Sequence, residues 1–101
     1  MAKDKRYSII VDNFNRCLVC GSYLNIHKHE IFFGRGKREL SIKYGLVVPL
    51  CGRHHNQSND GVHGKNGHKL DIELKKTGQK AFQYHYPDLD FLEIFHKNYL
   101  D

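Results

Sequence analysis

Three cysteines and one histidine occur in two closely spaced pairs. Cys17 and Cys20 form a C-x2-C pattern, and Cys51 and His54 repeat that spacing as C-x2-H further along the chain. Thiolate sulfur and imidazole nitrogen are the ligands that Zn²⁺ prefers, and two such pairs complete a tetrahedral shell around one ion. We therefore predict a structural zinc site. The alternative is that the cysteines are buried apolar residues and that His54 lies on a helix surface.

A second set of ionisable side chains lies close to these pairs. His27, His29 and Glu30 precede the second pair, and His55 directly follows His54. Alternate side chains of a strand share a face, which groups His27 with His29, whereas adjacent helix residues point about 100° apart. His55 is therefore not expected to bind the same ion as His54. If zinc joins the two segments, His29 or Glu30 would converge with His55 in a pocket suited to a divalent ion with open positions for water and phosphate.

Short β-prone segments surround the cysteine pairs. Gly21 can close a tight turn at the first pair with a positive φ angle, and Pro49 confines its strand to an edge or a strand end. We predict strands at residues 7–11, 26–33 and 46–50, a turn of helix or a loop at 40–44, a helix at about 52–58 and a loop at 61–67.

The last third of the chain is predicted to be helical. Its first helix has apolar residues at roughly helical spacing, namely Leu70, Leu74, Ala81 and Phe82. Gly78 weakens that helix by about 1 kcal/mol relative to Ala. Residues 86–88 interrupt it, and Asp88 can cap a second helix. The apolar stripe of that second helix is Leu89, Leu92, Phe95 and Tyr99. We predict one domain over residues 1–101, with a core at about 15–66 and a helical C-terminal extension at about 68–100.

Composition limits the class of protein. A chain of 101 residues with 40% hydrophobic content forms one modest core, which a bound metal would stabilise. Cysteines in metal-ligand spacing indicate a reducing compartment rather than a disulfide framework. The apolar runs are too short to span a bilayer, and no charged-then-apolar leader opens the chain. We therefore expect a soluble intracellular protein with no membrane partner.

The net charge of +5 is unevenly distributed. Basic side chains crowd the segment after the first histidines, at Arg35, Lys37, Arg38 and Lys43. Such clusters favour polyanionic partners through phosphate contacts and counterion release, although a solvated surface is the simpler explanation of charge alone. The proximity of the basic segment to the histidines favours nucleic acid.

The order of these residues resembles the HNH endonuclease family in its zinc-stapled form, and the nearest members are small HNH proteins of bacteriophages and prophages. Their pattern is a cysteine pair, a histidine doublet followed by Ile or Val, and a strand that leads into a second ligand pair. Here the matching residues are Cys17 and Cys20, then His29-Glu30-Ile31, then the run LVVPLCGRHH that ends at His55. The resemblance extends from Cys17 to about His63.

This resemblance implies an α+β fold with a treble-clef, or ββα-metal, core that holds a structural Zn²⁺ and is followed by C-terminal helices. It also implies metal-dependent hydrolysis of a DNA phosphodiester in the cytoplasm of a bacterial host cell. Carried over by position, His29 and His55 bind one Mg²⁺, Mn²⁺ or similar ion. Glu30 stands where the family has its general base.

Two positions depart from the family pattern. The usual base is a histidine, and Glu30 is a weak base at neutral pH. The two roles could be exchanged, with Glu30 on the cation and His29 as the base. The family's central asparagine falls near Leu46 and is missing, which removes the residue that usually orients the base. A backbone carbonyl could replace it.

Further residues are weaker candidates for the same site. Asn59 lies one helical turn after His55 and could reach its ion, or could simply end the helix before Asp60. His63 could contact metal or phosphate or be an ordinary loop histidine, and His27 could be a spare base, an orienting residue or an exposed strand residue. The expected phosphate contacts, which position DNA without reading its sequence, come from Arg35, Lys37, Arg38 and Lys43.

We therefore predict a small HNH endonuclease that acts on phage or prophage DNA. With one site per domain it should nick, and cutting both strands would need a homodimer or a partner. The alternative is a catalytically weak, zinc-bound DNA-binding module, or an accessory to a phage recombination or packaging protein.

Overall fold

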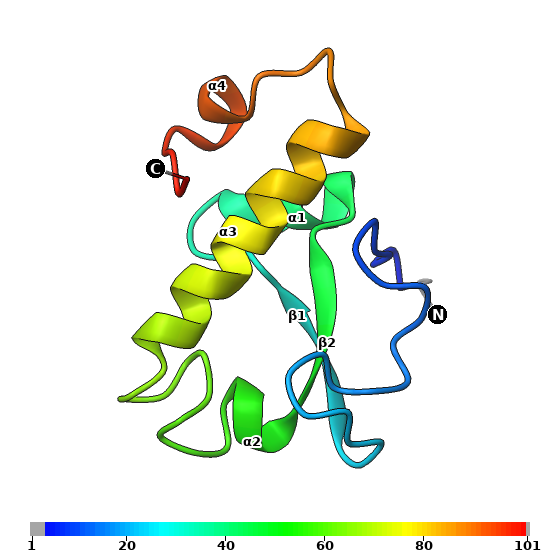
Figure 1. Ribbon diagram of the computed structural model, residues 1–101, viewed down its shortest axis with the longest axis vertical. Helices are drawn as coiled ribbons and strands as arrows, with labels where there is room; N and C mark the ends of the chain where they lie inside the picture. The colour runs from blue at the N-terminus through cyan, green and yellow to red at the C-terminus, as the bar shows by residue number, and fades with distance from the viewer. Residues whose placement is uncertain (1–3, 101) are drawn as a thin grey trace.

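The computed structural model describes residues 4–100. Two strands and four helices follow one another in these residues: β1 (Ile26–Glu30), α1 (Lys37–Tyr44), β2 (Val47–Cys51), α2 (Gly52–His55), α3 (His68–His85) and α4 (Phe91–Phe95). The protein therefore has a small, compact α+β fold (Figure 1).

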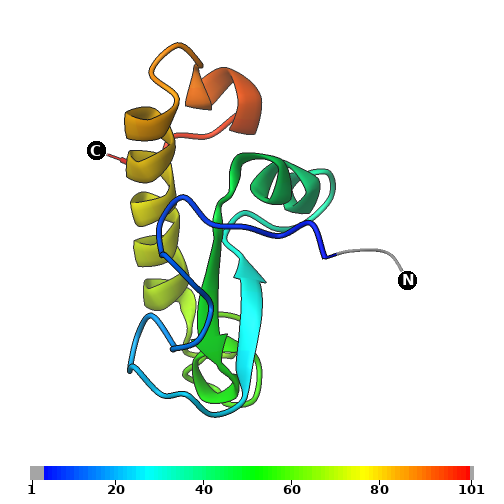
Figure 2. The same cartoon turned by 90° about the vertical axis from the view of Figure 1, so that its right-hand side faces the viewer.

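The two strands form an antiparallel pair that carries the functional residues. Ile26 lies opposite Cys51, and His29 lies opposite Val48. All five residues of β2 are buried, which explains their continuous apolar character. Pro49 is tolerated because each strand of a two-stranded pair has an outer edge, as predicted from the sequence. Figure 2 shows α3 running beside the strands and α1 at the end where β1 finishes and β2 begins.

Helix α3 approaches the end of β1 closely at Gly78. A Cβ atom at this position would lie 3.0 Å from Cε2 of Phe32 and 3.2 Å from Cγ2 of Ile31. Both neighbours are almost fully buried. Glycine therefore allows the helix to pack against the segment that follows β1, although it lowers helix propensity by about 1 kcal/mol relative to Ala. The predicted helix runs through Gly78 without a break.

Four phenylalanines join the C-terminal segment to this core. The rings of Phe91 and Phe95 stack with centroids 4.5 Å apart, Phe95 lies 4.8 Å from Phe32, and Phe91 lies 5.4 Å from Phe82. All four are buried. Aromatic pairs at such distances contribute about 0.5–1.5 kcal/mol each beyond their area burial, so these rings help to hold α4 to α3 and to the segment that follows β1.

The predicted strand at residues 7–11 is wrong. The hydroxyl of Ser8 accepts hydrogen bonds from the backbone N–H groups of Ile10 (3.0 Å) and Val11 (3.1 Å), and this local turn diverts the backbone from a ladder. Ile9 still donates one backbone hydrogen bond to Gly45, and its side chain packs against the core. The segment is therefore an irregular cover over the start of β2.

The helix predicted at about 52–58 is shorter, since α2 ends at His55. Asn56 has a φ angle of −140°, and the N–H of Gln57 returns to the carbonyl of Gly52 at 2.8 Å. The hydroxyl of Ser58 donates a hydrogen bond to the backbone carbonyl of Arg53 at 2.7 Å. These side-chain and turn bonds replace further helical turns.

The predicted second C-terminal helix differs in its cap and its buried face. Asp90, not Asp88, is the N-cap of α4, and its carboxylate accepts from the N–H groups of Leu92 and Glu93. Phe91 and Phe95 face the core, whereas Leu92 is 54% exposed. The helix ends where His96 takes a φ angle of 65°. The extension is thus helical over α3 and α4, and Tyr99 reaches the core from a non-helical tail.

Among residues 4–100, no helix combines the length and the apolar character needed to cross a membrane.

Candidate metal centres

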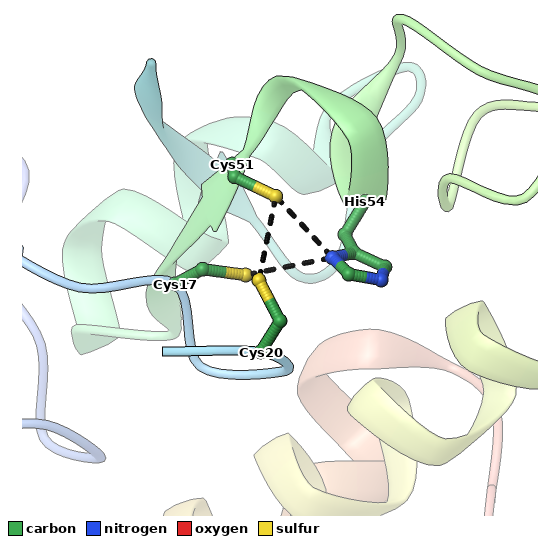
Figure 3. Close-up of side chains that lie close together, drawn as sticks. All are labelled: Cys17, Cys20, Cys51 and His54. Carbon is green, nitrogen blue, oxygen red and sulfur yellow. Dashed lines mark hydrogen bonds between the residues drawn. The ribbon is translucent and has the colours of Figure 1, made fainter. Parts of the chain in front are cut away.

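Cys17, Cys20, Cys51 and His54 meet at one point and are called the cysteine cluster below. Figure 3 shows them facing one another, with Cys51 at the end of β2 and His54 on α2. Nδ1 of His54 lies 3.3 Å from Sγ of Cys51 and 3.8 Å from Sγ of Cys17, and the sulfurs of Cys20 and Cys51 are 3.7 Å apart. A tetrahedron with metal–sulfur bonds of about 2.3 Å places neighbouring sulfurs about 3.8 Å apart. The four residues can therefore bind a metal ion such as zinc, and the predicted convergence of the two pairs is confirmed.

Backbone hydrogen bonds hold the first cysteine pair against β2. The N–H of Leu18 donates to the carbonyl of Pro49 at 2.9 Å, and the N–H of Gly21 closes the turn onto the carbonyl of Cys17 at 2.8 Å. Gly21 has a φ angle of 76°, which a glycine adopts without strain. Burial opposes ionisation of Cys17, but hydrogen bonds from the backbone of Cys51, Cys20 and Val19 lower its pKa to about 6. The thiolate, which is the form that binds metal, is thereby favoured.

His29, His55 and His63 form a second group and are called the histidine cluster below. One nitrogen from each ring lies within 4.8 Å of the others, and the ring centroids are 4.9–5.3 Å apart. His29 comes from β1 and His55 from α2. The structure therefore brings together the strand and helix histidines that the sequence predicts to converge, and it places beside them His63, which the sequence offered as a weaker candidate.

His63 is positioned by the exposed end of α2. The N–H groups of Val62 and His63 donate to the carbonyls of His54 and His55, each at 3.0 Å. A one-turn helix leaves such carbonyls without intrahelical partners, so the following loop satisfies them and carries His63 back beside His55. Gly61 permits this approach, because a Cβ atom there would lie 2.6 Å from the carbonyl oxygen of His55.

The three imidazoles surround a cavity of about 480 Å³ that also receives charged side chains. Its lining residues are Arg6, Lys28, His29, Glu30, Phe33, Arg38, His55, Asn56 and His63. Burial, followed by the charges of neighbouring histidines, lowers the pKa of His29 to about 3 and that of His55 to about 4. Burial also lowers the pKa of His63. The rings are thus neutral at pH 7 and offer lone pairs rather than positive charge.

The donor set fits a divalent transition-metal ion. His29 is 1% exposed, and within residues 4–100 its Nε2 atom has no hydrogen-bond partner. A buried polar atom without a partner costs about 1–3 kcal/mol, which a ligand at that nitrogen would remove. Imidazole nitrogen suits Zn²⁺, Co²⁺ or Ni²⁺ better than Mg²⁺, which prefers oxygen.

Glu30 lines the same cavity but does not belong to the histidine cluster. One carboxylate oxygen lies 3.9 Å from Nε of Arg38, and the side chain is 16% exposed. The carboxylate therefore stands beside the three imidazoles, next to a cation at the cavity wall.

His27 contacts the histidine cluster through His55. Its Nδ1 lies 2.8 Å from Nδ1 of His55, and its Nε2 lies 3.2 Å from Oδ1 of Asn25. His27 is thus a neighbour of the helix histidine and not one of the three clustered ligands.

The basic residues at the cavity differ from those expected. Of the four predicted phosphate contacts, Arg38 lines the cavity, whereas Arg35, Lys37 and Lys43 are not among its lining residues. Arg6 and Lys28 were not predicted. Arg6 comes from a segment without a motif, and strand alternation places Lys28 on the opposite face of β1 from His29. The chain offered no pattern that points to Arg6.

Asn59 is also not among the residues that line the cavity. Its carbonyl accepts a backbone hydrogen bond from Asn66 at 2.6 Å, which belongs to the loop that places His63.

Comparisons of the chain with protein-family models, with curated proteins and with solved structures give no significant match. The functional argument therefore depends on the geometry of the two clusters.

Proposed function

We propose that the protein is a metal-dependent endonuclease of the HNH type, which hydrolyses phosphodiester bonds in DNA and nicks one strand at a time. In this proposal the cysteine cluster holds a structural zinc ion in a treble-clef core, and the histidine cluster holds a second divalent ion. The observation that carries the proposal is the convergence of three neutral imidazoles on one cavity with a carboxylate and two arginines.

The order of elements supports this reading. A cysteine-bearing turn, β1, the intervening helix α1, the antiparallel strand β2 and the short helix α2 follow one another. Helix α2 supplies one ligand to each cluster through His54 and His55. Because these two residues are adjacent, an ion in the cysteine cluster would fix the direction of His55. The cysteine cluster thereby acts on the second site through the backbone of α2.

The residues of the cavity divide into three roles. A cation held by His29, His55 and His63 would supply Lewis-acid stabilisation of the negative charge that develops on the phosphate. Glu30 would accept a proton from the attacking water, since His29 is occupied as a ligand. Arg38 and Arg6 would hold the substrate phosphates in place through sequence-independent contacts.

Plasmid nicking tests the proposal directly. We expect the zinc-loaded protein to convert supercoiled plasmid to open circles with Mn²⁺ or Co²⁺, and EDTA to stop the reaction. His29→Ala should reduce the rate about 100-fold or more, because it removes the ligand whose buried Nε2 atom has no hydrogen-bond partner among the described residues. His85→Ala is the matched control, since His85 is an exposed histidine at the end of α3.

Equal zinc content and equal thermal unfolding in the two variants would separate a lost site from a lost fold. If His29→Ala nicks plasmid as fast as His85→Ala with every ion, the endonuclease proposal is wrong.

One observation favours a second candidate, a zinc-bound DNA-binding module without chemistry. Glu30 stands where the family has a histidine base, and its carboxylate lies 3.9 Å from Nε of Arg38, an ion pair that also suits a purely structural role. A protein of this kind would retard DNA in a gel with no cleavage under any ion, and the nicking assay therefore distinguishes the two functions.

A further inference from the structure

His27 and His55 share a short contact between like atoms. Nδ1 of one ring lies 2.8 Å from Nδ1 of the other, and the rings meet edge to face with centroids 5.0 Å apart. A neutral imidazole has one donor nitrogen and one acceptor nitrogen. One ring must therefore donate through Nδ1 and the other must accept there, so the contact couples the tautomers of the two histidines.

Two amide side chains determine which ring donates. Nδ2 of Asn25 donates to Oε1 of Gln57 at 2.7 Å, so Oδ1 of Asn25 is the atom that faces Nε2 of His27. A carbonyl oxygen only accepts, and Nε2 of His27 must then carry the hydrogen. In the neutral ring this leaves Nδ1 of His27 bare, so that Nδ1 of His55 is the donor. Nε2 of His55 then keeps its lone pair.

The amide pair is built into the junction between the strands and α2. A Cβ atom at Gly52 would overlap both Oε1 of Gln57 and Nδ2 of Asn25, so glycine leaves room for this exposed amide pair. The backbone carbonyl of Asn25 accepts from the N–H of Gly52 at 2.9 Å. Asn25 has a φ angle of 54°, which asparagine tolerates better than most residues. The backbone hydrogen bond to Gly52 thus positions Asn25, and the amide hydrogen bond to Gln57 orients its side chain.

We propose that Asn25 and His27 are positioning residues that hold His55 in the tautomer with hydrogen on Nδ1 and present its Nε2 to the cavity. The inference rests on the proposed function for its purpose, since that nitrogen would be the one offered to a divalent ion. Metal-binding histidines are usually oriented by a hydrogen bond from their second nitrogen to a carboxylate or a carbonyl. Here a neutral imidazole backed by an amide takes that place.

The tautomers can be measured without any catalysis. We propose two-dimensional NMR of the ring nitrogens in the protein loaded with one equivalent of zinc, at pH 8, without a second ion. The expected result is hydrogen on Nδ1 of His55 and on Nε2 of His27. Hydrogen on Nε2 of His55 in the wild-type protein would overturn the proposal.

Three variants test the direction of the chain of hydrogen bonds. His27→Phe keeps an aromatic ring and removes the acceptor, so His55 should lose its preference for hydrogen on Nδ1. His27→Asn places an acceptor oxygen near the former Nδ1 and should retain the preference. Asn25→Asp keeps an acceptor towards His27 and should also retain it, whereas it would abolish the preference if Asn25 acted as the donor.

A second readout is Mn²⁺ affinity, followed by the electron paramagnetic resonance of free Mn²⁺. Mn²⁺ is chosen because it is the weakest competitor for the zinc-binding thiolates. We expect His27→Phe to weaken binding about 10- to 100-fold and His27→Asn to restore it to within a few-fold. Equal affinity in wild type and His27→Phe would contradict a positioning role.

The outcomes for the two proposals are separable. The predicted tautomers in a protein that never nicks DNA would uphold the positioning residues and reject the endonuclease. Nicking that depends on His29, together with hydrogen on Nε2 of His55, would uphold the endonuclease and reject the positioning residues.

Discussion

At the scale of single residues, His29 is the most constrained side chain of the site. Burial and nearby positive charge lower its pKa from about 6.5 to about 3, so the folded protein resists a proton that the unfolded chain accepts. The stability due to this neutral ring is fully present above pH 6.5 and is lost progressively as the pH falls towards 3.

A comparison of slopes tests this pH dependence. We expect the unfolding free energy that His29 contributes to fall by about 0.7 kcal/mol per pH unit at pH 6.5, where half of the unfolded chains are protonated at this ring, and by about 1.3 kcal/mol per pH unit at pH 5. The His29→Leu variant, measured by urea unfolding at the same zinc content, should show a slope that is shallower by these amounts. Both proteins lose stability by protonation of the cysteine cluster, so the difference between the two slopes is the quantity to measure. Identical slopes for the two proteins would show that the pKa of His29 is the same in the folded and the unfolded state.

Residue spacing made part of the site predictable. The C-x2-C and C-x2-H patterns determine which atoms can share one ion, and the strand and helix periods direct His29 and His55 away from those ligands. Arg6 could not be predicted, because it reaches the cavity from an irregular segment whose sequence shows neither a motif nor a strand or helix period. There the side chain lies between Asp4 and the carbonyl of Lys28.

At the scale of elements, the N-cap of α4 gives a clear contrast between neighbouring residues. The carboxylate of Asp90 accepts two backbone hydrogen bonds at the start of this helix. Asp90→Ala should therefore lower the unfolding free energy by about 0.5–2 kcal/mol, as measured by urea denaturation. Asp88→Ala is the control and should change it by less than about 0.5 kcal/mol, as expected for an exposed residue away from a cap. A larger effect at Asp88 would show that the cap lies where the sequence alone suggested.

The elements were predicted best where periodicity was long. The pattern of α3 extends over several turns, so one glycine does not obscure it. The segment at residues 7–11 has the composition of a strand but forms no ladder within residues 4–100, and the local bonds of Ser8 decide its shape. In α4 the sequence contains two possible apolar stripes, and the choice of Phe91 over Leu92 depends on contacts with Phe32 and Phe82 that are remote in sequence.

At the scale of the whole molecule, the proposed zinc ion is expected to decide whether the chain folds. The free energy of binding a structural zinc ion is about 10–16 kcal/mol in small zinc domains, which is comparable to the whole stability of about 5–15 kcal/mol for a domain. Removal of zinc with EDTA, or the substitution Cys17→Ser, should abolish the cooperative thermal transition followed by circular dichroism. Return of zinc should restore the transition in the wild type. If the EDTA-treated protein melts at the original temperature, the cysteine cluster does not bind a metal ion that stabilises the fold.

The overall α+β class follows from the sequence, but the way in which the C-terminal third covers the strands does not. Contacts such as Gly78 with Ile31 and Phe32 join residues far apart in the chain, and helical spacing alone says nothing about the partner of a helix face. Likewise, Gln79 anchors the tail by bonding the N–H of Tyr99 and the side chain of Asn98.

Adjacent residues of the short helix α2 serve different clusters, since His54 belongs to one and His55 to the other. Under the proposed function, a newly made chain in a zinc-starved cell would contain every hydrolytic side chain, but these side chains would not be brought together in an active site. Cleavage capacity would then follow the supply of zinc rather than the amount of polypeptide. Immature copies would be harmless to the genome around them.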